Sequence, residues 1–145
     1  MKAQEPDRFF AAYERYWLED EAANGSFLRL AANRATDLVC LSVEEESDGR
    51  PATACAIPGD QVVVSRASDE ALGRIADALV ARRLDTPGIF APVPEAGRLA
   101  AMLTERTGLT FQSIKRMLHW ELTERAPLAP VAGTFRIATP AEIPV

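Results

Sequence analysis

Few residues in this chain could ligate a metal. It holds two cysteines, Cys40 and Cys55, and a single histidine, His119. A structural zinc site takes four ligands, most often cysteine and histidine, so the sequence predicts no metal. A hairpin centred on Asp48-Gly49 would place the two thiols diagonally on one face, about 7–8 Å apart and too far for an unstrained disulfide. We therefore expect two reduced cysteines in the core.

The best candidate for an anion-binding site is the junction between an expected strand and the helix that follows it. This junction reads VSRASDE over residues 64–70. An anion at such a junction binds the free N–H groups of the helix N-terminus. Arg66 and Ser68 suit that role. However, the segment has no glycine to let a phosphate approach the backbone, and Asp69 and Glu70 would repel it. We expect Ser68 to cap the helix and Arg66 to lie in solvent.

Three further side chains are candidates for acid and base chemistry: Tyr13, Tyr16 and His119. The tyrosines belong to an aromatic stripe with helical spacing, and we expect them in the core or at an interface. His119 falls on the half-polar face of an expected strand, where an edge or interface position is favoured over a catalytic base. The sequence therefore assigns no catalytic residue and no cofactor-binding residue.

The composition is that of an ordinary globular protein. The chain has 145 residues, of which 48% are hydrophobic and 26% charged, with a net charge of -5. A domain of this length buries roughly two thirds of its unfolded surface. No segment approaches the ~20 apolar residues of a membrane span, and the N-terminus lacks a secretory signal, so we expect a cytoplasmic location and no membrane contact. The basic residues are scattered, which argues against nucleic acid as a partner.

The hydrophobic pattern predicts an α/β (α+β) fold with the element order ααβββαβαβ. Helices are expected over 6–19, 27–34, 68–84 and 94–107, with a break between the first two at Asn24-Gly25-Ser26 and a cap at Gly108. Strands are expected over 37–45, 51–58, 61–65, 88–91 and 110–123, the first three forming an antiparallel meander. Three consecutive valines in the third strand predict burial on both faces.

The C-terminal part of the chain, after residue 124, is expected to lie outside the first domain. A proline-rich stretch over 125–133 has no periodicity and is typical of a linker. A further strand is expected to begin at residue 134, with no strand to pair with. This gives a domain over 1–124, a linker over 125–133, and the first strand of another domain over 134–145.

One long segment carries a family resemblance. It spans residues 56–108 and reads AIPGDQVVVSRASDEALGRIADALVARRLDTPGIFAPVPEAGRLAAMLTERTG. An expected strand ending HWELTE, a proline-rich linker and the segment FRIATPAEI follow it. This resembles the first half of bacterial two-domain GNAT-type N-acetyltransferases, in which a degenerate domain precedes the catalytic one. The resemblance covers nearly the whole chain. It implies a mixed, mostly antiparallel central sheet flanked by helices, and a catalytic domain that begins at residues 134–145.

The family holds the pyrophosphate of acetyl-CoA in a turn patterned Arg/Gln-x-x-Gly-x-Gly/Ala, which the junction over 64–70 lacks. The resemblance therefore implies that this half binds no acetyl-CoA, and that the missing domain transfers the acetyl group to an amine. It also implies that the two domains pack together and that the turn between the first two helices lies on the acceptor side. Trp17, Glu21 and Asn24 are the candidates there, with core packing for Trp17 and a helix cap at Asn24 as alternatives.

The sequence is also compatible with other functions. The face around Lys115, Met117 and His119 is a second candidate surface, for domain docking or for a homodimer. The chain is alternatively a free-standing interaction module that dimerises through a sheet edge. A third possibility is a small-ligand-binding domain that uses the cleft between the third and fourth strands.

Overall fold

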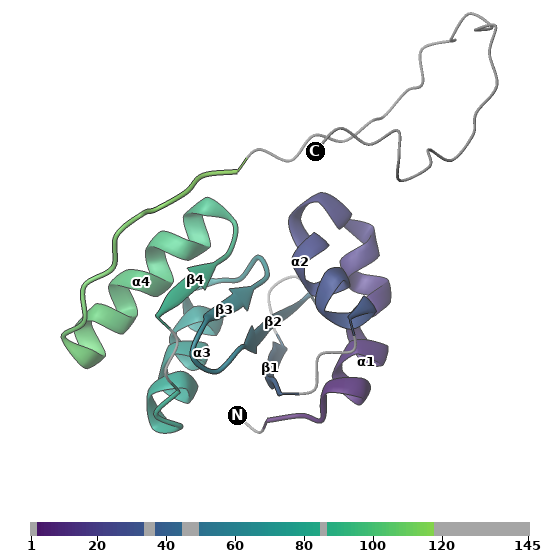
Figure 1. Ribbon diagram of the computed structural model, residues 1–145, viewed down its shortest axis with the longest axis horizontal. Coiled ribbons are helices and arrows are strands. Elements are labelled where there is room, and N and C mark those ends of the chain that lie inside the picture. Colours follow the sequence, from purple (N-terminus) through teal and green to yellow (C-terminus); the bar gives the residue numbers. More distant parts are fainter. Residues whose placement is uncertain (1–2, 34–36, 45–49, 85–86, 118–145) are drawn as a thin grey trace, which may run out of the picture.

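Helices flank both faces of a central sheet in the computed structural model, which describes residues 3–33, 37–44, 50–84 and 87–117 (Figure 1). The elements in chain order are α1 (Pro6–Glu19), α2 (Glu21–Ala32), β1 (Val39–Glu44), β2 (Pro51–Ala56), β3 (Gln61–Val64), α3 (Asp69–Ala81), β4 (Gly88–Phe90) and α4 (Val93–Thr107). This order confirms the mixed α/β class and the predicted sequence of elements as far as α4. Within the described part, no helix is long and apolar enough to cross a membrane.

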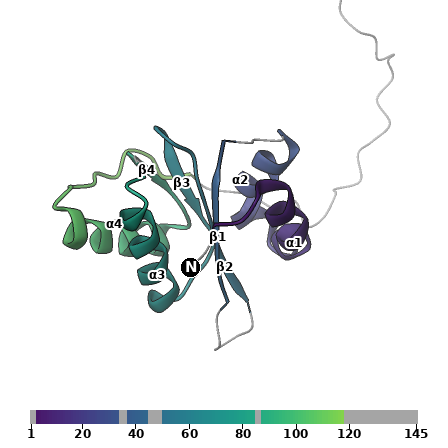
Figure 2. The ribbon, with the colours of Figure 1, turned by 90° about the horizontal axis from the view of Figure 1, so that it is seen from below.

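The sheet has the strand order β1-β2-β3-β4. The first three strands are antiparallel neighbours, and α3 connects β3 to β4, which run parallel. Figure 2 shows the sheet between two helical layers, with α1 and α2 on one face and α3 and α4 on the other. Because both faces are covered, the three valines of β3 are all buried, as the sequence predicts.

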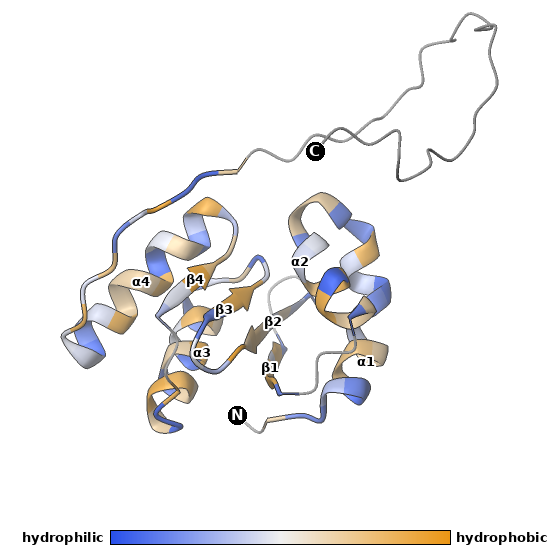
Figure 3. Cartoon of the chain, viewed as in Figure 1, coloured by the Kyte–Doolittle hydropathy of each residue, from blue (hydrophilic) through white to orange (hydrophobic). Residues whose placement is uncertain are grey.

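The layer formed by α3 and α4 covers an aliphatic core. The helices contribute an apolar stripe at helical spacing, and the strands of the sheet are largely hydrophobic (Figure 3). Its members include Leu41, Val43, Ala52, Ala54, Val62, Val64, Leu72, Ile75, Leu79, Leu99 and Leu103. Burial of this shared stripe is what holds both helices on the sheet.

The layer formed by α1 and α2 covers a core of a different kind. Rings of Phe9, Phe10 and Trp17 are buried along α1, and Trp17 stacks on Phe27 of α2 with ring centroids 4.8 Å apart. The sheet meets these rings with the two cysteines and Val63. Proline at position 6 starts α1, since a missing N–H does no harm in the first turn.

The backbone favours glycine at Gly108 through a positive φ and at Gly88 through a close approach. Gly108 ends α4 in the left-handed conformation, with φ of 75°, and its N–H bonds the carbonyl of Thr104, so the predicted cap is confirmed. Gly88 begins β4 where an added Cβ would lie 3.2 Å from the Cβ of Gln61. That close approach lets β4 pair with β3.

The break between the first two helices lies at Asp20, so the prediction of a break at Asn24-Gly25-Ser26 is wrong. The side chain of Asp20 accepts a hydrogen bond from the N–H of Ala23 and caps α2, which runs through Asn24 and Gly25. A helical glycine costs about 1 kcal/mol relative to alanine. Burial of Phe27 and Leu30 in the same helix offsets that cost.

The register of the first hairpin also differs from the prediction. Cys40 lies directly opposite Cys55, not opposite Ile57, so the pairing is shifted by two residues. The Sγ atoms lie 3.6 Å apart instead of the expected 7–8 Å, and both cysteines are free and buried. The prediction failed because it fixed the register from the turn residues alone, whereas packing on both faces of the sheet selects it.

The strand expected over 110–123 is not present in its described part. Residues 110–117 have no strand pairing, and Ile114, which the alternation placed on the apolar face, is 95% exposed. A strand forms only where its backbone groups find a partner, and none of the described strands pairs with this segment. The rest of that strand, the linker and the expected strand from 134 lie outside the described residues.

Candidate functional site

The parallel pair of strands defines the place where a ligand would be expected. In open sheets with parallel strands, ligands bind beyond the carboxyl ends of the strands, where the chain turns into a helix. Here β3 ends at Val64 and β4 at Phe90, and residues 65–68 lead from β3 into α3. We refer to residues 65–70 as the β3–α3 junction.

At the end of β3, Ser65 forms hydrogen bonds with Thr53 of β2 and with Arg66 of the junction. Its N–H donates to the carbonyl of Thr53 at 3.0 Å, and its hydroxyl accepts the N–H of Thr53 at 2.9 Å. The same hydroxyl donates to the carbonyl of Arg66 at 3.1 Å. A side chain thus completes the ladder between β2 and β3 where a backbone carbonyl would normally do so, and the Ser65 N–H is not available to a ligand.

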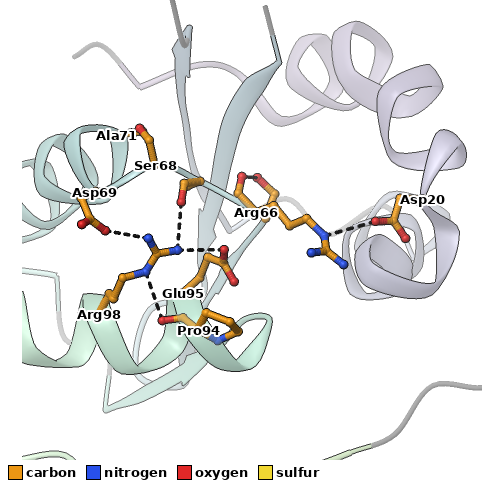
Figure 4. A network of polar contacts seen from close by, with 10 residues as sticks. Asp20, Arg66, Ser68, Asp69, Ala71, Pro94, Glu95 and Arg98 are labelled. Carbon is orange, nitrogen blue, oxygen red and sulfur yellow. Dashed lines mark hydrogen bonds and ion pairs between the residues drawn. The ribbon is translucent and has the colours of Figure 1, made fainter. Parts of the chain in front are cut away.

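At the start of α3, Arg98 of α4 contacts the junction through Asp69 and Ala67 (Figure 4). Its Nη1 lies 2.7 Å from Asp69 Oδ1, and its Nη2 donates to Glu95 Oε1 at 2.9 Å and to the Ala67 carbonyl at 3.2 Å. Its Nε also donates to the carbonyl of Pro94. One guanidinium therefore ties the first turn of α4 to the segment that enters α3.

The first turn of α3 contains a capping serine and two carboxylate side chains. Ser68 Oγ accepts the N–H of Ala71 at 3.2 Å, which confirms the predicted cap. Asp69 and Glu70 lie in the first turn, where the helix dipole favours negative charge. With Glu95 they make three carboxylates against the two guanidinium groups of Arg66 and Arg98, so this group of side chains carries one net negative charge, which disfavours a phosphate.

Arg66 links the junction to the opposite helical layer. Its Nε lies 3.3 Å from Oδ2 of Asp20, the cap of α2, and its side chain is 65% exposed, as predicted. An ion pair this exposed stabilises by at most about 1 kcal/mol. The pair nevertheless marks the point where the β3–α3 junction and the α1–α2 turn meet (Figure 4).

The three candidate acceptor-side residues lie in different surroundings. Trp17 is fully buried, and its Nε1 donates to Thr53 Oγ1 at 3.1 Å across the sheet interface. Asn24 is buried inside α2, where its Nδ2 donates to the carbonyl of Asp20, so it is not the helix cap that the sequence suggested. Glu21 is exposed in the first turn of α2. Two of the three candidates are therefore buried and one is exposed.

Two buried acceptor atoms, Asn24 Oδ1 and Glu95 Oε2, have no hydrogen-bond partner among the described residues. Asn24 belongs to α2 and Glu95 to α4, so one lies in each helical layer. An unmatched buried acceptor costs about 1–3 kcal/mol unless water or a ligand reaches it. Neither layer is therefore fully satisfied by its own side chains.

The other candidates are structural or lie outside the described residues. Tyr13 and Tyr16 are half-buried against the aromatic core, as expected, and the ring of Tyr13 lies 5.0 Å from that of Phe9. Lys115 and Met117 are exposed, and His119 lies outside the described residues. Sequence reasoning missed Arg98 and its partners, although the spacing of Glu95 and Arg98, three residues apart on one helix, is typical of an ion pair.

No group of three or more histidine, cysteine, aspartate or glutamate side chains able to hold a metal occurs in the described ranges. Comparison of the chain with models of protein families, with curated proteins and with solved structures found no match. The site must therefore be interpreted from its own chemistry. That chemistry is a strand-to-helix junction in which Ser65, Ser68 and Arg98 bind neighbouring backbone groups and carboxylates, with a net negative charge.

Proposed function

We propose that this chain is the non-catalytic, N-terminal half of a cytoplasmic two-domain GNAT-type N-acetyltransferase. In this proposal a second domain, beginning at residues 134–145, binds acetyl-CoA and transfers its acetyl group to an amine. The observation that carries the proposal is the β3–α3 junction, where a GNAT enzyme would hold the cofactor pyrophosphate. Here Ser65, Ser68 and Arg98 are hydrogen-bonded to the protein itself, and the carboxylates of Asp69, Glu70 and Glu95 outnumber the two nearby arginines.

The topology supports the same proposal. Two helices lead into a three-strand antiparallel meander, and a parallel strand then follows through α3. That arrangement agrees with the order implied by the resemblance in residues 56–108. This agreement supports the proposal that the β3–α3 junction corresponds to the family's cofactor turn, although its residues do not suit that cofactor.

Exposed apolar side chains after α4 support a docked partner domain. Leu109 is 62% exposed, Ile114 is 95% exposed and Met117 is 43% exposed, all within the segment that leads toward residue 134. Apolar side chains gathered on one exposed segment are typical of an interaction surface. We propose that this segment packs against the second domain.

The division of chemistry follows from the residues present. Attack of an amine on a thioester needs a base for the ammonium proton and donors for the oxyanion, and the proposal assigns both to the second domain. Of the three acceptor-side candidates, Trp17 and Asn24 serve packing, because both are buried. Glu21 remains the candidate for facing the amine, because its carboxylate is exposed beside Asp20.

The test is the coding sequence downstream of codon 145, followed by expression of its complete product. The proposal predicts a second domain with an Arg/Gln-x-x-Gly-x-Gly/Ala turn, and one acetyl-CoA bound per two-domain chain. Replacing glycines of that turn should abolish binding, whereas Arg66→Ala should leave it unchanged. A complete product without such a turn, or one that loses acetyl-CoA on Arg66→Ala, would contradict the proposal.

A further inference from the structure

Two thiols face each other in the interior of the hairpin formed by β1 and β2. Cys40 and Cys55 are direct partners in the register, their Sγ atoms are 3.6 Å apart, and both are fully buried. They are the two cysteines of the whole chain. Any disulfide within residues 1–145 must therefore join this pair.

The hydrogen-bond pattern of the sheet shows which kind of pair they form. Two residues that flank Cys55 at alternate positions are hydrogen-bonded to the β3 side: the carbonyl of Thr53 accepts the Ser65 N–H, and the Ile57 N–H donates to the carbonyl of Gln61. Because backbone groups along a strand alternate in direction, the N–H and carbonyl of Cys55 also point toward β3. The carbonyl of Cys40 accepts the N–H of Gln4 on the outer side of β1. Cys40 and Cys55 thus form a pair without mutual backbone hydrogen bonds.

This type of pair brings the two residues closest together. Directly opposed residues of a non-hydrogen-bonded pair have Cα atoms about 4.5 Å apart, inside the range of about 4.4–6.8 Å that disulfides span. The sulfur atoms would have to approach by about 1.5 Å to reach a bond length of about 2.05 Å. Rotation of the two side chains supplies such a movement without a change of register.

We propose that Cys40 and Cys55 are a reversible oxidation site, which a hydroperoxide converts into a cross-strand disulfide. The Cys40 thiolate attacks the peroxide oxygen, the O–O bond breaks, and the departing hydroxide leaves as water after taking a proton. The sulfur of Cys55 then displaces the hydroxyl of the sulfenic acid, which leaves as a second water. Overall, two thiols lose two electrons and two protons, and one hydrogen peroxide becomes two waters.

The two thiols have different roles in this reaction. The hydrogen bond between the two thiols lowers the pKa of Cys40 against the opposing effect of burial, so we assign the attack to Cys40. The same hydrogen bond, together with burial, raises the pKa of Cys55, which makes Cys55 the resolving sulfur. Hydrogen peroxide is close to water in size. We expect local opening of β1, together with its bridge from Gln4 to Cys40, to admit it.

The disulfide would tie β1 to β2 across about 15 residues and so restrict the unfolded chain. The experiment treats the folded chain with hydrogen peroxide at low protein concentration, and then alkylates the free thiols after unfolding. We expect two alkylated thiols in the reduced protein and none in the oxidised one, with the mass of a monomer that has lost two hydrogens. The Tm should rise by about 5 °C or more, and a reductant should reverse the shift.

The urea-unfolded chain provides the reference for thiol reactivity, and two variants test the roles. Cys55→Ser should accumulate a sulfenic acid at Cys40 that dimedone traps, and Cys40→Ser should give no adduct. The proposal is overturned if the folded chain keeps both thiols under conditions that oxidise the unfolded chain. It is equally overturned if the disulfide forms but lowers Tm, and an adduct on Cys55 in Cys40→Ser would reverse the assigned roles.

Discussion

The two faces of the central sheet are covered by cores that differ in chemistry. Under α3 and α4 the buried core is aliphatic, and the directed contacts of that layer, such as the ion pairs of Arg98 and Arg106, lie outside it. Under α1 and α2 it is aromatic and contains directed contacts, such as the hydrogen bond from Trp17 to Thr53 and the thiol pair. The comparison teaches that directed contacts lie inside the core on the aromatic face and outside the core on the aliphatic face.

The largest expected effect is at Trp17. Trp17→Ala should lower the free energy of unfolding by about 4 kcal/mol, because it removes a fully buried ring and leaves a cavity. Trp17→Phe keeps a ring but leaves the Thr53 hydroxyl without its donor, so a loss of about 1–2 kcal/mol is expected. Urea denaturation measures both.

Leu72→Ala is the counterpart on the aliphatic face. It should cost about 3 kcal/mol, and Leu72→Met, which keeps the volume and has no hydrogen bond to lose, should cost under about 1.5 kcal/mol. If Trp17→Phe were as stable as the wild type, the hydrogen bond would add nothing. The two faces would then differ in shape only.

A smaller effect is expected at Arg98, where the α3–α4 layer has its directed contacts. Arg98→Ala should cost about 2 kcal/mol, because it leaves the carboxylate of Glu95, whose side chain is 9% exposed, without a counter-charge. Combining it with Glu95→Gln should restore part of the loss. Denaturation of the single and double variants gives the coupling free energy.

Arg106 serves as the matched control for Arg98. It also lies 2.7 Å from an aspartate of α3, but that partner, Asp77, is 68% exposed. Arg106→Ala should therefore cost less than about 1 kcal/mol. Equal losses for Arg98→Ala and Arg106→Ala would show that burial of Glu95 does not matter.

The smallest effect is a gain of stability in α2. Gly25 lies inside the helix with nothing within 4 Å of an added Cβ, so Gly25→Ala should raise the free energy of unfolding by about 0.5–1 kcal/mol. Gly108→Ala should instead lower it by about 1 kcal/mol, because φ is positive there. Thermal unfolding of the two variants separates them by sign, and a loss for Gly25→Ala would show that α2 is strained at this position.

The parts predicted from the sequence are those fixed by local patterns. The stripe of Leu72, Ile75 and Leu79 marks α3, Ser68 and Gly108 mark helix ends, and the valines of β3 mark a strand covered on both faces. Each of these signals lies within a few residues of the element that it specifies.

The errors have a tertiary origin. The register of Cys40 with Cys55 depends on packing against both helical layers, and the continuation of α2 through Gly25 depends on burial of Phe27. The role of Arg98 depends on the loop before α3, distant in sequence. Residues 110–117 alternate like a strand, but none of the described strands pairs with them.

The most direct measurement is calorimetric titration of this chain with acetyl-CoA and with coenzyme A. A β3–α3 junction closed by Ser65, Ser68 and Arg98, and net negative, predicts no binding heat up to about millimolar ligand, where the binding free energy is only about -4 kcal/mol. Saturable micromolar binding that is lost in Arg66→Ala or Ser68→Ala would contradict it. That result would make the junction a working cofactor site.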